Sequence, residues 1–155
     1  MTQAVVAGAI VVATLNALSG LTGAWIWYRG DPREGRAAPA FWVMLRIGQG
    51  SALTLAIAVG SLAAAGKHPR EDLFYLYALL PLAIGFVAEQ LRVTSAQAVL
   101  EERGMQSAQE VGTLPDGEQQ ELLASVLRRE LGVMALSALV VVFLALRAAG
   151  TAHGF

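Results

Sequence analysis

Charged side chains occur inside or directly beside long apolar segments at three places in the chain. Arg46 lies within FWVMLRIGQGSALT, Glu89 follows LYALLPLAIGFVA, and Glu130 precedes the apolar segment that begins at Leu131. A charge in the middle of a bilayer costs about 2.5–3.5 kcal/mol on insertion scales, so a charge in such a place is expected to have a partner or a function. An arginine beside carboxylates could form an ion pair, bind an anion or substrate, or take part in proton transfer.

The distances of these residues from the predicted turns place them at one height. The turn between the second and third apolar segments is centred near His68, and Arg46 and Glu89 are almost equally far from it. The next turn is centred near Glu110, and Glu89 and Glu130 are almost equally far from that one. Because helix rise per residue is constant, equal distances in antiparallel helices mean equal heights. We therefore expect a charged layer near the inner membrane face, in which Arg46 pairs with Glu89.

This layer has two interpretations. Paired charges avoid the desolvation penalty of an isolated charge, so the layer could be an internal set of ion pairs. Alternatively, it binds a small anionic or amphiphilic ligand. Two rival explanations concern single residues: Arg46 could extend to the interface by itself, and Arg92 offers Glu89 a partner on its own helix. The predicted layer consists of Arg46, Gln49, Glu89, Gln90, Arg92, Arg129 and Glu130, and Gly20 of the first segment is predicted to face it.

Long apolar segments must position this layer. Hydrophobic residues make up 55% of the 155 residues and charged residues only 15%, against about 25% charged residues in ordinary soluble proteins. A bilayer core requires about 20 helical residues, and continuous apolar runs favour helices over a β-barrel. The sequence predicts an all-α integral membrane protein, an antiparallel bundle of four transmembrane helices in one domain, 1–155. The expected spans are about 4–28, 39–65, 72–92 and 129–148.

Two of these helices are expected to continue outside the membrane. The third apolar segment runs on into VTSAQAVLEER without a break before Gly104, and the sequence LPDGE, with Asp116 as the helix cap, begins a helix that leads into the fourth span. We expect residues 93–128 to form a helical hairpin in which several of six apolar side chains pack between the two helices. The six are Leu100, Val111, Leu114, Leu122, Leu123 and Val126.

The distribution of basic residues predicts the orientation of the chain. Cytoplasmic loops are enriched in lysine and arginine, and the first loop and the hairpin region together carry seven basic residues against three in the second loop and the C-terminal tail. We therefore expect a multi-pass protein of the cell membrane with both termini outside and with the first loop and the hairpin in the cytoplasm. The seven are Arg29, Arg33, Arg36, Arg92, Arg103, Arg128 and Arg129, and the three are Lys67, Arg70 and Arg147.

Several classes of chemistry find no support in the sequence. The net charge of −1 argues against a nucleic-acid-binding protein. The chain has no cysteine, and its two histidines, His68 and His153, lie outside the apolar segments, so no metal or cofactor is expected. A polar run in the first span, which includes Asn16, Ser19 and Gly23, is interpreted as a helix-packing face. The expected partners are the lipid bilayer and either a protein partner or further copies of the same chain.

In outline, the chain resembles the membrane-associated enzymes of glutathione and eicosanoid metabolism. The resemblance consists of four spans with outside termini and of Arg46 with Gln49 near the cytoplasmic start of the second span. Those enzymes use inner-leaflet arginines to hold a glutathione carboxylate. Their fuller acidic and asparagine pattern is missing from LRIGQGSALT, and we assign no family.

Three functions agree with these observations. The first is a non-enzymatic accessory or scaffold subunit that docks a partner through the cytoplasmic hairpin. The second is a binder of a small amphiphilic or anionic ligand, or an enzyme that conjugates one, at the charged layer. The third is an oligomeric channel or carrier, which is disfavoured because no span carries a continuous polar stripe from one face to the other.

Overall fold

The computed structural model describes residues 2–29, 37–105 and 108–153, and all regular structure in these ranges is helical. Four of the helices are long and apolar enough to cross a membrane, which confirms the prediction of an all-α protein with four candidate spans. The first-loop residues Arg33 and Arg36 lie outside the described ranges. The helices are α1 (Thr2–Arg29), α2 (Ala37–Ala64), α3 (Leu73–Glu102), the short α4 (Ala108–Val111) and α5 (Asp116–Thr151).

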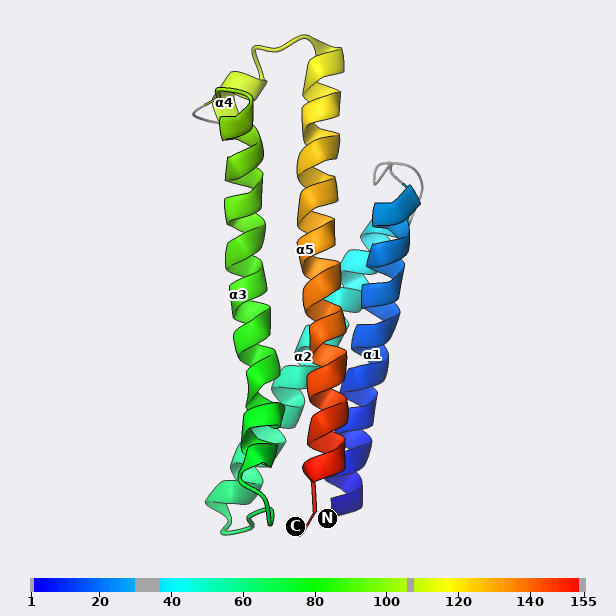
Figure 1. The fold of residues 1–155 in the computed structure, drawn as a ribbon, viewed down its shortest axis with the longest axis vertical. Coiled ribbons are helices and arrows are strands. Elements are labelled where there is room, and N and C mark those ends of the chain that lie inside the picture. The colour runs from blue at the N-terminus through cyan, green and yellow to red at the C-terminus, as the bar shows by residue number, and fades with distance from the viewer. Residues whose placement is uncertain (1, 30–36, 106–107, 154–155) are drawn as a thin grey trace.

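Helix α5 is the central element of the structure. It packs extensively against both α1 and α3, whereas α2 packs mainly against α1 and much less against α3. Figure 1 shows α5 between α1 and α3, with α2 crossing obliquely behind it. The N-terminus and the C-terminus lie at the same end of the molecule (Figure 1).

Aromatic and basic residues meet at both ends of the apolar part of the helices. The guanidinium of Arg128 lies 5.4 Å from the ring centroid of Trp27 at one end, and that of Arg147 lies 5.5 Å from Tyr77 at the other. Tryptophan and tyrosine favour the membrane interface. At about 1.5 Å per residue, Arg128 and Arg147 are about 28 Å apart along α5, close to the bilayer core of about 30 Å. The pairs therefore mark the two edges of an apolar band of membrane thickness.

Glycines of α1 allow three helices to approach closely in this band. A Cβ atom on Gly23 would lie 2.5 Å from the ring of Phe41 on α2 and 2.7 Å from Cβ of Ala135 on α5. A Cβ atom on Gly20 would lie 2.8 Å from Leu139 of α5. Small residues at such positions let van der Waals contacts form between helix backbones in lipid. The packing face predicted for the first span is therefore present, and Gly20 contacts α5.

Beyond this band, α3 and α5 extend past the ends of α1 and α2 (Figure 1). In this extension Val99 and Leu122 are buried, and Nη1 of Arg129 lies 3.0 Å from Oε1 of Glu102. Leu123 is not among the predicted residues that pack inside the hairpin, because its side chain is 52% exposed. Adjacent residues of an α-helix point about 100° apart, so Leu122 and Leu123 cannot both face inward. The other four predicted packing residues, Leu100, Val111, Leu114 and Val126, are half-buried.

Candidate functional site

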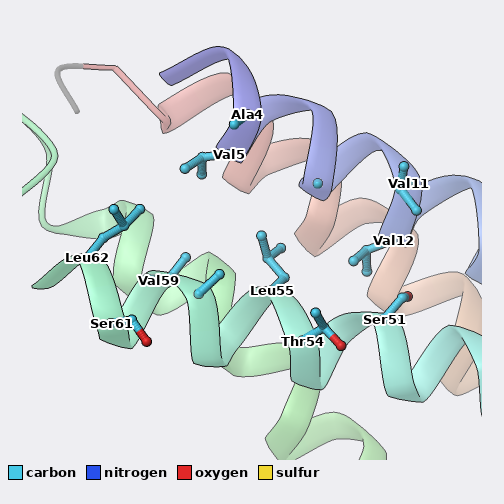
Figure 2. A pocket seen from close by; sticks show the side chains of 12 residues that line it. Ala4, Val5, Val11, Val12, Ser51, Thr54, Leu55, Val59, Ser61 and Leu62 are labelled. Atoms are coloured by element: carbon cyan, nitrogen blue, oxygen red, sulfur yellow. The ribbon is translucent and has the colours of Figure 1, made fainter. Parts of the chain in front are cut away.

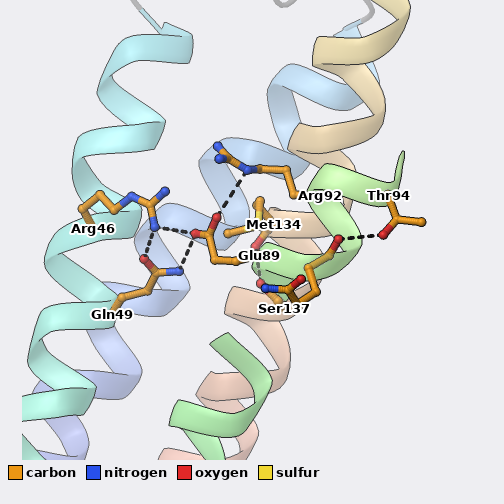
Figure 3. Close-up of polar contacts among 8 residues, drawn as sticks. Arg46, Gln49, Glu89, Arg92, Thr94, Met134 and Ser137 are labelled. Carbon is orange, nitrogen blue, oxygen red and sulfur yellow. Dashed lines mark hydrogen bonds and ion pairs between the residues drawn. The ribbon is translucent and has the colours of Figure 1, made fainter. Parts of the chain in front are cut away.

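Arg46 and Glu89 are in contact, and Gln49 joins them. Arg46 and Gln49 are three residues apart and therefore share one face of α2. Nη1 of Arg46 donates hydrogen bonds to Oε1 of Gln49, at 2.7 Å, and to Oε1 of Glu89 on α3. Nε2 of Gln49 donates to the same Glu89 oxygen at 3.5 Å. Figure 3 shows these three side chains converging between the two helices, so the ion pair predicted from the sequence is present.

A second arginine approaches Glu89 from its own helix. Nε of Arg92 lies 3.3 Å from Oε2 of Glu89, as an ion pair without hydrogen-bond geometry. The guanidinium of Arg92 also lies 5.3 Å from the ring centroid of Trp42 on α2. The local pair with Arg92 therefore coexists with the interhelical pair, and both arginines connect α2 to α3. We refer to Arg46, Gln49, Glu89 and Arg92 as the polar cluster.

Three residues of the predicted layer lie outside this cluster. Gln90 is exposed, because a residue next to Glu89 on a helix must point elsewhere, and its backbone carbonyl accepts a hydrogen bond from Thr94. Arg129 pairs instead with Glu102, on the hairpin side of the cluster. Glu130 is half-buried and interacts electrostatically with Arg92 and Glu89, but it forms no ion pair with a described residue.

The misplacement of Arg129 has a simple geometric cause. The prediction assumed arms of equal length on either side of Glu110. In the structure, α3 ends at Glu102, and α5 begins at Asp116. These two ends are nearly symmetric about Glu110, but α5 begins farther out along the hairpin than α3 ends (Figure 1). Residues of α5 are therefore displaced toward the hairpin relative to their predicted height.

Sequence reasoning did not assign Asn16 to this site. Asn16 is 2% exposed, and its Nδ2 donates to the carbonyl oxygens of Val12 at 2.9 Å and of Gly48, on α2, at 3.4 Å. The first span thus contributes Asn16, one turn before the expected Gly20, at the level of Gly48 and Gln49. The signal that identifies it is an amide side chain in an otherwise apolar part of the span.

A cavity of about 320 Å³ lies next to the polar cluster, between all four long helices. Gln49 and Glu89 border it, together with Asn16 of α1 and Ser137 of α5. Most of the remaining wall is apolar, and it includes Pro81 and Gly85 of α3. The site thus combines an apolar interior with a few polar groups, the usual composition of a small-molecule site.

A larger groove of about 690 Å³ lies between α1 and α2. Figure 2 shows apolar side chains such as Val12, Leu55 and Val59 lining it. The hydroxyl groups at its edge donate to carbonyls of their own helix, for example Thr54 to Gly50 at 2.9 Å and Ser61 to Ile57 at 2.8 Å. This groove is therefore lined mainly by apolar side chains.

Comparison of the chain with protein families, curated proteins and solved structures gives no match. The fold and the site define an all-helical chain with four helices long and apolar enough to cross a membrane and with an interhelical polar cluster. Within residues 2–29, 37–105 and 108–153, no three histidine or acidic side chains lie close enough together to hold a metal ion.

Proposed function

We propose that the protein is a non-enzymatic accessory or scaffold subunit of the cell membrane that docks a partner protein through the hairpin of α3 and α5, at about 93–128. The observation that carries this proposal is the extension of both helices past α1 and α2 (Figure 1). A simple connection between two helices needs only about 2–8 residues. The buried side chains of Val99 and Leu122 and the ion pair of Arg129 with Glu102 support an ordered platform rather than a loose loop.

The hairpin also offers an apolar surface to a partner. Leu123 and Leu127 are 52% and 36% exposed, and residues four apart share one face of a helix. Both lie on the hairpin side of Arg128, which is near the edge of the apolar band. Apolar side chains exposed outside the membrane are typical of protein interaction sites.

In this proposal the polar cluster is structural. The carboxylate of Glu89 is engaged by Arg46, Gln49 and Arg92, so its charge is compensated while the cluster holds α2 against α3. Paired buried charges of this kind can fix the relative positions of helices.

The proposed orientation predicts which residues an impermeant thiol reagent can reach. The chain has no native cysteine, and Gln109 and His153 are both exposed. With the hairpin in the cytoplasm, Gln109→Cys should react with an impermeant maleimide only after permeabilisation, whereas His153→Cys should react in intact cells. Labelling of Gln109→Cys in intact cells, with protection of His153→Cys, would reverse the orientation.

Docking is tested by photo-crosslinking in living cells. A photoreactive amino acid at Leu123 should give a discrete protein adduct, because this side chain is exposed on the hairpin. The matched control is Leu136, which is 65% exposed but lies within the apolar band and should face lipid. An adduct of twice the chain's own mass would identify the partner as a second copy. No adduct from Leu123, or the same adducts from both positions, would contradict docking through the hairpin.

A further inference from the structure

We propose that the cavity between the four long helices binds a neutral lipid that carries a hydroxyl group. The hydroxyl would donate a hydrogen bond to Oδ1 of Asn16, and the apolar part would extend between α2 and α3 into the bilayer. This proposal does not depend on docking through the hairpin.

The first argument is an acceptor on the cavity wall that receives no hydrogen bond from a described residue. Both hydrogen bonds of Asn16 to other residues are donated by Nδ2, and no described residue donates to its Oδ1. Asn16 is 2% exposed and borders the cavity. A buried polar group without a partner is unfavourable, and polar groups in protein interiors almost always find one. A ligand with a hydroxyl group would supply the missing donor.

The second argument is the charge of the remaining wall. Oγ of Ser137 donates to the backbone oxygen of Met134 at 2.8 Å, so this oxygen faces the cavity as a further acceptor. The carboxylate of Glu89 borders the cavity, while Arg46 and Arg92 are already paired with it. Neither arginine lines the cavity, so an anionic head group inside it would meet acceptors and a carboxylate but no cation. The wall favours a neutral donor over a fatty acid or a phosphate.

The third argument is size and access. At about 30 Å³ per water-sized group, a cavity of about 320 Å³ accommodates about ten non-hydrogen atoms, enough for the polar end and the first part of a chain. Gly50 and Leu53 of α2 and Phe86 of α3 border the cavity and are exposed. The cavity thus opens sideways between the two adjacent helices that pack least against each other. A ligand can enter from the bilayer and leave the rest of its chain there.

The test uses the purified full-length protein and two probes, a diazirine-bearing dodecanol and the dodecanoic acid with the same label. The alcohol should label the segments around Gly50–Leu53 and Leu82–Phe86 about fivefold to tenfold more than the acid. This factor corresponds to the one hydrogen bond that the alcohol donates to Oδ1 of Asn16, an acceptor that otherwise has no donor. Equal labelling by the two probes would overturn the proposal.

Two variants make the test specific to the cavity. A side chain at Gly85 meets no atom within 4 Å and borders the cavity, so Gly85→Leu should fill it and abolish the preference for the alcohol. Gly60 is equally open but lies outside this cavity, so Gly60→Leu should behave as the unchanged protein. Asn16→Leu, with the acceptor removed, should label equally with both probes. A preference for the alcohol that survives either Gly85→Leu or Asn16→Leu would contradict the proposed site.

Discussion

Leu122→Asp is expected to open the hairpin of α3 and α5, whereas Leu123→Asp is expected to leave it closed. Leu122 is 1% exposed and Leu123 is 52% exposed. Loss of a buried leucine side chain costs about 2–5 kcal/mol, and burial of an unpaired carboxylate adds to this penalty. Hydrogen exchange of residues 93–128 in detergent should therefore become much faster in Leu122→Asp only.

The two leucine variants control for each other, because they add the same charge to neighbouring positions. Both should insert into the membrane, since the four apolar spans are unchanged. Equal exchange rates in the two variants would show that Leu122 does not pack inside the hairpin. The platform on which the proposed docking depends would then lack its main buried contact.

Glu89→Gln is expected to destabilise the protein more than Arg46→Gln. Glu89 contacts both Arg46 and Arg92, so its neutralisation leaves two guanidinium groups without a counter-charge. Breaking a buried pair costs about 3–5 kcal/mol. The Glu89 side chain is 28% exposed, so we expect about 2–3 kcal/mol after allowance for screening by water. Arg46→Gln, which leaves the pair of Glu89 with Arg92 intact, should cost about 1–2 kcal/mol.

Reversible unfolding in mixed micelles, followed by circular dichroism, measures these differences. Glu102→Gln is the matched control, because it also removes one carboxylate from an ion pair with an arginine, but its side chain is 65% exposed. An exposed pair contributes about 0.2–1 kcal/mol. If Arg46→Gln were as damaging as Glu89→Gln, the contact of Glu89 with Arg92 would contribute nothing to stability.

The amino-acid sequence predicts the four candidate spans and the pair of Arg46 with Glu89 for the same physical reason. Burial of charge in lipid is very unfavourable. Long uncharged stretches therefore indicate spans, and a charged residue within such a stretch indicates that it has a partner. The short turn near His68 then fixes the relative height of the second and third spans. The pair is predictable because a short turn leaves little uncertainty in the number of residues that separates each charge from the turn.

The rotation of a helix about its axis is much harder to predict. Leu122 and Leu123 are identical in type and adjacent, and only the packing of α5 on α3 decides which of them is buried. The long connection near Glu110 likewise hides where α5 begins, so Arg129 was expected in the polar cluster but pairs with Glu102. Turn spacing gives the height of a residue but not the direction in which its side chain points.

The cavity could not be predicted, because it results from the arrangement of all four long helices. Residues of all four helices line it, and it opens between α2 and α3, which pack much less against each other than α1 and α5 do. Asn16 and Gly85 each have an ordinary explanation in a single helix, as a packing residue and a flexible residue. Only their common place on the wall of one cavity gives them a joint role.

The contact between Arg46 and Glu89 holds α2 to α3 and borders the cavity, so a double-mutant cycle on this pair tests the account most directly. The free energy of unfolding is measured for the unchanged protein, Arg46→Gln, Glu89→Gln and the double variant. Residues in one ion-pair network show coupling energies of about 0.5–3 kcal/mol, and we predict about 1–2 kcal/mol here, because Arg46 is half exposed. A coupling energy of zero, with the two single losses simply adding, would contradict the polar cluster as the link between these helices.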